Sequence, residues 1–584
     1  MMIAELLELL HAKGVVLSLK EDNLSVTGDE AALSDESLLS QLRTHKPALI
    51  ELLRSGHYTD GAAGVPPNNI PSDARYITPD MLSLVTLEQA EIDAIAQQVT
   101  GGYANIQDIY PLTSLQEGML FHHMLSPAKD VYVEGFLLAF PSHARLARFI
   151  DALQQVIDRH DVLRTAIFWQ GQDQALQVVM RQAAFHSETV AVETGQDVAR
   201  QLEMRYDPGA YRLDIGRAPL LHGYQAEDSA NDRWLLRILS HHIVIDHMTL
   251  ELLVEEAQLI DKGQAHRLAT PVPFRNFVAQ IRQGVTEQQH QAFFSDMLGD
   301  VAEPTLPWGL LNAQGDGGNV QETQQMLPPS LSLALRAQAR RQGITVASLM
   351  HFAWALVLGK ASDRTDVVFG TVLFGRMQGL AGRTPGMLMN TLPLRIQLAD
   401  KSVADNLQDV HQRLAQLLRH EHAPLTLAQR CSAVVAPTPL FTALLNYRYS
   451  AAQEADAPPD KDDVIYLNGK ERTNYPLTLS VDDFGQDFSL TVQVDSSVAP
   501  ECVCELMQNA LARLVDLLDQ QPDAPLSRLD ILPAAEYQRV VRGWNDTARD
   551  WPDATLHQLF AEQAQRTPDA PAVEDERQQL SYAA

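Results

Sequence analysis

The segment SHHIVIDHMTLELLVEE, residues 240–256, gathers side chains that can carry out acid–base chemistry. His241 and His242 are adjacent, and Asp246 and His247 follow shortly after them. An imidazole has an unperturbed pKa of about 6.5, so it can take up or release a proton near neutral pH, and its neutral form can bind a metal ion. The segment therefore fits three kinds of site: a proton-transferring group, a metal centre, or a hydrogen-bonded pair of histidines in the core.

A strand and a helix are expected to position these residues. Residues 234–245 have the composition of a strand. Successive side chains of a strand point to opposite faces, so His241 and His242 cannot both enter one pocket from regular backbone. A helix is predicted directly afterwards by apolar residues at helical spacing, namely Leu250, Leu253, Val254 and Ala257. Asp246 and His247 then lie at a junction of the kind where functional groups are often found.

Other patterns narrow the three possibilities without deciding among them. The spacing of His241, His242, Asp246 and His247 matches no common zinc pattern, and HEH at 420–422 is not H-E-x-x-H, so we expect no metal. The chain also has no G-x-S-x-G elbow, no phosphate-binding loop and no glycine-rich dinucleotide turn. The histidines remain its best candidates for catalysis.

Composition indicates a folded, multidomain protein. The chain has 584 residues, 45% of them hydrophobic and 20% charged, and a net charge of −29. This negative charge argues against a nucleic-acid partner, because such binding depends mostly on Lys and Arg. Three cysteines without a C-x-x-C pair fit a reducing compartment. The N-terminus lacks the basic leader of a signal peptide, and the longest uncharged apolar stretch is too short for a membrane helix. We therefore expect a cytoplasmic protein that does not associate with membranes.

The chain divides into four parts. Residues 1–55 predict a small αββα module, in which VVLSL and NLSVT form two strands joined by a charged turn. Residues 56–104 predict a linker, with one short helix opened by a capping box from Thr86 to Gln89. Residues 105–530 mix strand and helix patterns, as expected for an α/β or α+β enzyme. Residues 531–584 predict a second linker and the start of a further domain.

Six motifs give the chain a family resemblance. HHIVIDH resembles the HHxxxDG motif of condensation domains in nonribosomal peptide synthetases. Five further stretches resemble motifs of that family in the family's order: IYPLTSLQEGMLFH (109–122), RHDVLRT (159–165), PGMLMNTLPLR (385–395), HEHAPL (420–425) and PLFTALLNYR (439–448). Residues 1–55 resemble TubC-type docking domains. TLHQLFAEQAQRTPDAPAV resembles the entry to an adenylation domain, here too short to bind ATP.

The resemblance implies a fold and a set of partners. The fold is two-lobed and similar to chloramphenicol acetyltransferase, with an N-lobe of about residues 105–275, a C-lobe of about 276–530, and a central tunnel between the arms of a V. Donor and acceptor carrier proteins bring their substrates on 4'-phosphopantetheine, and the chain itself binds no cofactor. The C-terminal tail of an upstream synthetase subunit docks on the exposed edge of the hairpin, where Lys13 and Lys20 meet its acidic residues.

The resemblance also assigns roles to the adjacent pair His241 and His242, here called the histidine doublet, and to the residues that follow it. His242 matches the catalytic second histidine, and His241 matches the first, which is usually structural. Asp246 matches the motif aspartate and is expected to form a salt bridge with Arg395, because an unpaired buried charge is costly. His247 stands where the family has glycine, and three outcomes are open: the imidazole narrows the donor route, alters the choice of donor, or lies aside without effect.

Two further residues are expected on the donor side of the tunnel. Asn390 lies in the PGMLMNTLPLR segment. Arg376 ends the stretch DVVFGTVLFGR, which is expected to cross between the lobes and to form the floor of the tunnel. Both assignments follow from the resemblance.

The implied reaction is attack of an α-amino group on a thioester carbonyl, which gives an amide and a free carrier thiol. The alternatives are a starter-type domain that takes its acyl group from acyl-CoA, a dual epimerisation and condensation domain, a domain that modifies a bound residue, and a non-catalytic scaffold that recruits carriers. The docking module favours a carrier-bound donor. The presence of His242, Asp246 and Arg395 argues against an idle scaffold.

Overall fold

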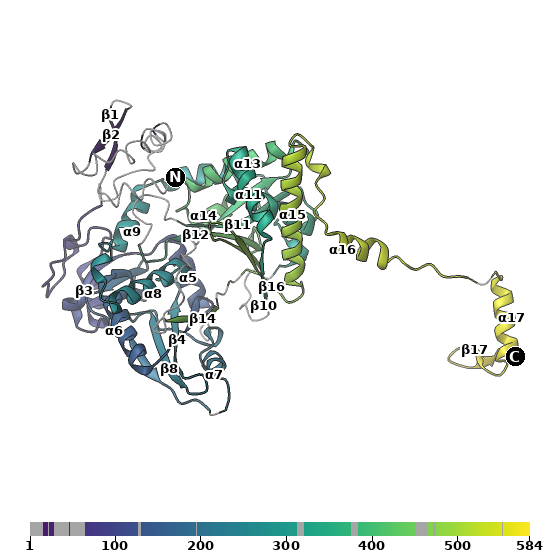
Figure 1. Ribbon diagram of the computed structural model, residues 1–584, viewed down its shortest axis with the longest axis horizontal. Coiled ribbons are helices and arrows are strands. Elements are labelled where there is room, and N and C mark those ends of the chain that lie inside the picture. Colours follow the sequence, from purple (N-terminus) through teal and green to yellow (C-terminus); the bar gives the residue numbers. More distant parts are fainter. Residues whose placement is uncertain are drawn as a thin grey trace. The chain divides into compact units, whose positions relative to one another are not determined.

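The computed structural model describes most of the chain (Figure 1). The described residues are 16–20, 23–27, 42, 46, 65–125, 130–193, 195–311, 320–374, 384–449, 464–470, 473, 475–551 and 553–584. They belong to two compact units, Met1–Ile531 and Leu532–Ala584. Lys13 and Arg376 lie outside the described residues, as do most of the two helices expected in the first module.

The N-terminal module contains the expected hairpin. β1 (Val16–Lys20) pairs antiparallel with β2 (Asn23–Thr27), and the register places Lys20 opposite Asn23. The two strands form a two-stranded sheet of their own, so no other described strand pairs with their outer edges. The backbone of Lys20 lies in β1, but its side chain is outside the described residues.

Residues 65–105 pack against the body of the protein. They include η1 (Pro79–Met81), α4 (Gln89–Gln98) and η2 (Gly102–Asn105). Ile77, Ile92 and Ile95 are fully buried in one cluster with residues of the strands that follow. The capping box of α4 is formed by Glu88 and Glu91, two residues after the predicted Thr86–Gln89. This stretch is therefore a packed segment and not a free linker.

The first half of the body contains two sheets. A three-stranded sheet has the order β3-β6-β5, and a five-stranded sheet has the order β14-β4-β9-β8-β7. Their strands are β3 (Ile106–Pro111), β4 (Val133–Phe140), β5 (Thr165–Phe168), β6 (Leu176–Met180), β7 (His186–Thr189), β8 (Leu221–Asp228), β9 (Arg233–His241) and β14 (Ile465–Lys470).

Helices cover both faces of the five-stranded sheet (Figure 1). The helices of this half are α5 (Ser114–Leu125), α6 (His143–Arg159), α7 (Val198–Arg205), α8 (His247–Asp261) and α9 (Phe274–Gln283), with the short η3 (Asp161–Arg164), η4 (Pro208–Ala210) and η5 (Ala265–Arg267). On one face, α6 and α8 share a core with even-numbered strand residues such as Phe136 and Ile238. On the other, α7 packs on odd-numbered residues such as Leu137 and Leu239.

The second half is built on a six-stranded sheet of order β10-β16-β15-β13-β11-β12. Its strands are β10 (Val320–Met326), β11 (Asp366–Phe374), β12 (Met389–Gln397), β13 (Ala443–Tyr449), β15 (Leu477–Asp483) and β16 (Phe488–Asp495). Its helices are α10 (Glu287–Leu298), η6 (Pro307–Gly309), α11 (Pro329–Gln342), α12 (Val346–Ser362), α13 (Val403–Leu418), α14 (Leu425–Arg430), α15 (Pro500–Gln520) and η8 (Leu526–Arg528).

These two halves make a mixed α/β protein, with a large hydrophobic core in each half and two smaller clusters in the first, which confirms the predicted fold class. α12 is buried continuously from Ser348 to Gly359, as expected for a helix that is apolar on all sides. At the junction, α9 contributes Phe274 and Phe277 to the first core, and α10 contributes Phe294 to the second. Two consecutive helices therefore connect the two lobes.

β14 connects the two halves through a sheet. In sequence it lies between β13 and β15 of the second sheet, but it pairs antiparallel with β4 of the first. The predicted crossing segment, DVVFGTVLFGR, was wrong: its residues 366–374 form β11, which stays inside the second sheet between β12 and β13. The alternating apolar residues of β11 fit an inner strand equally well, so the pattern alone could not distinguish the two roles.

The second unit is small. It contains α16 (Ala534–Tyr537), the π-helix η9 (Gln538–Gly543), α17 (Leu556–Arg566) and the hairpin of β17 (Pro571–Glu574) and β18 (Gln579–Ser581). Across the described part of the chain, no single helix has the length and apolar character of a membrane span. Only α11 and α12 taken together meet those criteria, and they are bent by 107° relative to each other.

Candidate active site

The strand pair β4 and β9 brings the histidine doublet to the end of the first lobe's sheet. Val133 on β4 is the register partner of His241, the last residue of β9. The pairing extends one residue further, because the backbone N–H of His242 donates to the carbonyl of Tyr132 at 2.8 Å. The strand predicted to run to Ile245 ends here, and residues 242–244 form a turn before α8 begins at His247.

His241 is a structural residue that is completely buried. Its Nε2 lies 2.9 Å from Oδ2 of Asp130, and its Nδ1 accepts the backbone N–H of Ile243 at 3.0 Å. His123, on α5, forms a hydrogen bond through Nδ1 to the same oxygen of Asp130. Burial lowers the pKa of His241, which keeps the ring neutral. Burial opposes ionisation of Asp130, but the hydrogen bonds from His123 and His241 hold the pKa of that carboxyl well below its usual range.

The ligand atoms of His123, Asp130 and His241 all lie within 4.8 Å of one another, so a metal ion has to be considered. The tautomer of His241 argues against one. Its Nδ1 accepts a hydrogen bond and therefore carries a lone pair, so in the neutral ring the proton is on Nε2, facing Asp130. A metal ligand needs the lone pair at that nitrogen. We interpret the cluster as a hydrogen-bonded network that fixes the end of β9.

His242 has the opposite proton arrangement. Its Nδ1 lies 2.6 Å from the carbonyl oxygen of Ile245, and since a carbonyl can only accept, Nδ1 carries the proton. In the neutral ring, Nε2 then has a free lone pair. The side chain is 16% exposed, in contrast to the sealed ring of His241, and Oε1 of Glu134 lies 3.7 Å from Nδ1. Of the two histidines, His242 is the one with a basic nitrogen available to a substrate.

Asp246 is buried and caps the helix that follows the doublet. Its Oδ1 accepts hydrogen bonds from the backbone N–H of Thr249 at 2.7 Å and from Oγ1 of Thr249 at 2.6 Å. Oγ1 of Thr249 in turn accepts the backbone N–H of Gly386 at 2.9 Å. Gly386 has φ of +138°, and a Cβ there would lie 2.6 Å from the ring of Phe274. Asp246 thus holds the loop after His242 and, through Thr249, joins it to the segment that leads into β12.

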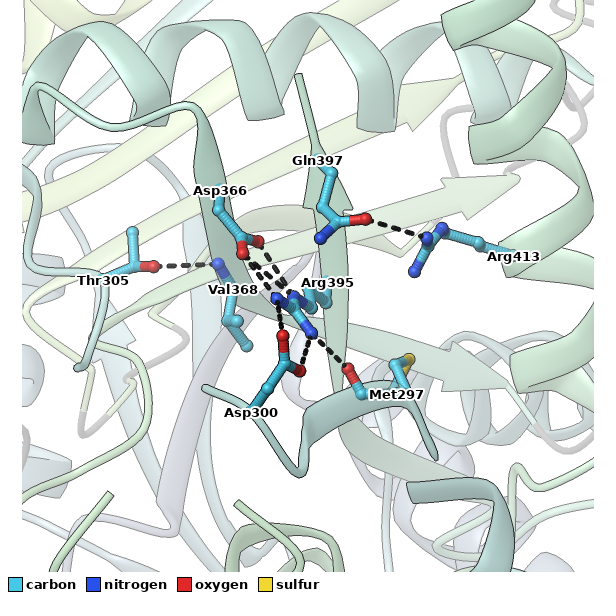
Figure 2. A network of polar contacts seen from close by, with 8 residues as sticks. All are labelled: Met297, Asp300, Thr305, Asp366, Val368, Arg395, Gln397 and Arg413. Atoms are coloured by element: carbon cyan, nitrogen blue, oxygen red, sulfur yellow. Dashed lines mark hydrogen bonds and ion pairs between the residues drawn. The ribbon is translucent and has the colours of Figure 1, made fainter. Parts of the chain in front are cut away.

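The expected salt bridge between Asp246 and Arg395 was wrong. Arg395, on β12, binds Asp366 and Asp300 and donates to the carbonyl of Met297 (Figure 2). All five N–H groups of its guanidinium are used by these three partners. The hydrogen bonds to Asp366 and Asp300 raise the pKa of Arg395 above its usual range. Arg395 therefore stabilises the second lobe and does not hold the loop after His242.

The residues expected near the donor route differ in their positions. Asn390, on β12, is buried and its Nδ2 donates to the carbonyls of Glu421 and Ala423 at 2.7 and 2.8 Å, so it anchors the HEHAPL loop. His247 is the first residue of α8, with a side chain 32% exposed and its Nε2 3.4 Å from Oε1 of Glu251. Of the residues named from the sequence, the structure brings together His241, His242, Asp246 and His247.

Sequence reasoning missed three residues of this site. His123 directly follows the quoted motif at 109–122, and it becomes meaningful only when Asp130 is known to bridge it to His241. Glu134 lies on β4 with no motif around it, and only the register of β4 and β9 brings it to His242. A search for acidic residues on the partner strand of the doublet would have found Glu134.

Comparison with known families decides the assignment. The condensation-domain family matches residues 106–541, which include the doublet, Asp246 and the segment around Gly386. The chain belongs to the condensation-domain family. A second family, the TubC N-terminal docking domain, matches residues 3–55 of this condensation-domain protein.

Relatives and solved structures agree with this assignment. The chain is 42% identical over 581 residues to malpibaldin synthetase and 44% identical over 524 residues to malpinin synthetase, both of Mortierella alpina. These matches cover 96% and 89% of the chain, but only 10% and 7% of the relatives' own length. A holo four-domain nonribosomal peptide synthetase bound to AMP and glycine matches 82% of the chain and 38% of its own, with a TM-score of 0.67 at 16% identity. The first condensation domain of the calcium-dependent antibiotic synthetase matches 73% of the chain and 99% of its own, with a TM-score of 0.57 at 18% identity.

The sequence predictions of a condensation domain and of a TubC-type docking domain are therefore confirmed. The condensation domain is an acyltransferase-type enzyme domain of nonribosomal peptide synthetases that forms amide bonds. The site described above lies within the matched residues, and its partly exposed histidine, His242, is suited to that chemistry.

Proposed function

We propose that this condensation domain joins an acyl or peptidyl donor, held as a thioester on one carrier protein, to an aminoacyl group held on a second carrier. The observation that supports this most is the proton arrangement of His242. Its Nδ1–H is held by the carbonyl of Ile245, so Nε2 is free to accept a proton from an approaching amine. Both substrates arrive on 4'-phosphopantetheine, and the protein supplies no cofactor of its own.

The reaction forms one C–N bond and breaks one C–S bond. The amine nitrogen attacks the thioester carbonyl carbon, and Nε2 of His242 takes the proton that the nitrogen loses. The tetrahedral adduct then expels the carrier sulfur, which takes up a proton and leaves as a free thiol. A free α-amino group has a pKa of about 7.7–8.0, so part of the acceptor is already unprotonated near neutral pH.

Positioning is expected to contribute more than proton transfer. A general base contributes about 10²–10⁴-fold to a rate, whereas holding two reactants in register can supply about 7–11 kcal/mol of the barrier. In this domain, Asp130 and His241 fix the strand end before His242, and Asp246 fixes the loop after it. His242 is thus a base whose backbone is held in place on both sides by hydrogen bonds.

The proposal is tested by loading both carriers. One carrier receives a set of acyl and peptidyl donors, the other a set of amino acids, and the intact mass of each carrier is followed after the protein is added. We expect the acceptor carrier to gain the donor group and the donor carrier to return to its free thiol. Chiral analysis of the product tells direct condensation from dual epimerisation and condensation. Transfer from acyl-CoA alone, or no transfer with any pair, would overturn the proposal.

We further propose that the β1–β2 hairpin binds the C-terminal tail of an upstream synthetase subunit as an added strand. The support is the docking-domain match together with a hairpin whose outer edges pair with no other described strand. Unpaired strand edges present N–H and C=O groups that an extended peptide can bind. Lys20 ends β1, and Lys13 precedes the hairpin, so both are suited to meet acidic residues of the tail.

The hairpin prediction is checked with a labelled acidic peptide from an upstream subunit's C-terminus. We expect Lys20→Glu to weaken binding to the intact chain by about 2–5-fold, since a surface ion pair contributes up to about 1 kcal/mol. Lys46→Glu, an exposed charge in the same module, is the matched control and is expected to bind normally. Fluorescence anisotropy measures both. Equal affinity of the intact chain and of a chain that lacks residues 1–55 would show that the tail binds elsewhere.

We propose that residues 532–584 form the entry to an adenylation domain, on the resemblance of TLHQLFAEQAQRTPDAPAV to that family. The lobe boundaries, at about residues 105–275 and 276–530, and a tunnel between the lobes remain proposals of the same kind. We also propose a cytoplasmic location. It is supported by Cys431 and Cys504, which form no disulfide within the described residues, as expected in a reducing compartment.

A further inference from the structure

A carboxylate lies beside the catalytic histidine on the neighbouring strand. Glu134 on β4 is the register partner of Ser240 on β9, two residues before His242. Alternation along a strand places Ser240 and His242 on one face of the sheet, and Glu134 on the same face. Oε1 of Glu134 lies 3.7 Å from Nδ1 of His242, and the two side chains are only 13% and 16% exposed. The pair is therefore close and largely shielded from water.

We propose that Glu134 is a positioning residue of the condensation reaction, whose carboxylate balances the positive charge that His242 gains when its Nε2 takes the amine proton. This inference rests on the proposed function of His242. The charge of an imidazolium is shared by both ring nitrogens, so a carboxylate on the Nδ1 side stabilises it without blocking Nε2. No bond to Glu134 forms or breaks, and the proton stays on the imidazole until the thiol leaves.

The other titratable groups on the elements around His242 make contacts of their own. On the preceding residue, His241 is neutral and donates to Asp130, which also binds His123 of α5. His122, on α5, packs edge-on against Tyr132, and burial lowers its pKa, so it adds no positive charge near neutral pH. Within the described residues, Glu134 is the carboxylate that lies within 4.0 Å of His242.

The geometry also explains why the negative charge of Glu134 is expected to affect the rate of condensation and not the structure of the resting protein. A base must start as the neutral ring, in which the Nδ1–H of His242 is already bound to the carbonyl of Ile245. The attraction to Glu134 grows only as the ring becomes an imidazolium. An interaction that is stronger in the transition state than in the ground state raises kcat and leaves KM largely unchanged.

Glu134→Gln in the full chain tests the inference, because it removes the charge and keeps the shape. With both carriers loaded, we expect the single-turnover rate at pH 7.5 to fall by about 10–100-fold, part of the 10²–10⁴-fold that a general base supplies. We expect the acidic limb of the pH–rate profile to move to lower pH, since a ring without its carboxylate neighbour is harder to protonate. Glu134→Asp, which keeps the charge, is expected to recover part of the rate.

Controls separate this inference from the proposed function. Glu227→Gln alters an exposed residue of β8, at the far end of its pairing with β9, and should keep the wild-type rate. A slow His242→Ala with a Glu134→Gln indistinguishable from wild type overturns the role of Glu134 and leaves the proposed function standing. A wild-type rate for His242→Ala overturns both. A rate loss in Glu134→Gln that is equal at every pH, with no recovery in Glu134→Asp, marks Glu134 as merely structural and also overturns the inference.

Discussion

Replacing Asp246 with alanine is expected to lower the free energy of unfolding of the condensation domain by about 2–3 kcal/mol. Asp246 caps α8 and is buried, so its loss leaves the backbone N–H of Thr249 without its acceptor in a place that water does not reach. The hydroxyl of Thr249 also loses its shorter hydrogen bond and is left with the carbonyl of Gly386 at 3.2 Å. The link between α8 and the segment before β12 is weakened as well.

The same substitution is expected to lower the condensation rate by about 100-fold, because small displacements of a catalytic group have effects of that size. The carbonyl of Ile245, which orients His242, is in the residue directly before Asp246. Asp246→Asn keeps an acceptor oxygen and is expected to lose less in both measurements. Urea unfolding gives the stability, and single-turnover condensation gives the rate.

Asp197 offers a matched control for the cap. It caps α7 through the backbone N–H groups of Ala199 and Arg200, but it is exposed to solvent. Asp197→Ala is therefore expected to lose only the value of the cap, about 0.5–2 kcal/mol, and to condense at the wild-type rate. If Asp246→Ala lost no more stability than Asp197→Ala and kept full activity, the role assigned to Asp246 would be wrong.

Local patterns predicted much of this site. The presence of β9, the helix α8 after it and the separate orientations of His241 and His242 follow from strand alternation and helical spacing within about twenty residues. The end of β9 does not, because the predicted strand ran to Ile245 and β9 ends at His241. The hairpin of the first module was predicted for the same reason, since two short strands and a charged turn are adjacent in sequence. Motif order then identified the family, which the matches confirm.

Partners that are distant in sequence could not be predicted in this way. Arg395 binds Asp300 and Asp366, and only the pairing of β12 with β11 and the position of α10 bring these residues together. The family resemblance suggested a salt bridge between Arg395 and Asp246, because both residues belong to family motifs. In the structure, however, every N–H group of the Arg395 guanidinium already donates to another partner. His123 and Glu134 were missed because neither their spacing nor their neighbours in sequence indicate that they lie near the doublet.

Residues 65–105 and Asn390 show that a local sequence pattern can be compatible with more than one structural role. Residues 65–105 are polar in part and rich in turns, yet their isoleucines pack into a core, because side chains of β3, β5 and β6 complete the cluster. Asn390 was expected beside a substrate, and it instead holds two carbonyls of the HEHAPL loop. In both cases the decisive partners come from elsewhere in the fold.

Substitution of His242 by alanine is expected to lower the rate of amide formation by about 10²–10⁴-fold, the usual contribution of a general base. The ring is the less buried member of the doublet, and in the neutral ring its Nε2 has a lone pair because Nδ1–H is bound to Ile245. Some turnover should remain, since the two carriers still hold the reactants together and part of the amine is unprotonated. The remaining rate is expected to rise with pH as more of the amine loses its proton.

Two other histidines serve as controls for this prediction. His186, on β7 of the same sheet, is exposed, so His186→Ala is expected to condense normally. His241 is buried and donates to Asp130, so His241→Ala is expected to lose stability together with activity. A variant of His242 that unfolds at the wild-type urea concentration and still condenses slowly would separate catalysis from folding.

The most direct measurement is the single-turnover rate of amide formation by wild type and His242→Ala, with donor and acceptor carriers both loaded and the product followed by intact mass. We predict that wild type transfers the donor group to the acceptor carrier and that the variant, equally folded, does so at least about 100 times more slowly. Equal rates for the two proteins would contradict the account, because Nε2 of His242 would then have no part in the reaction.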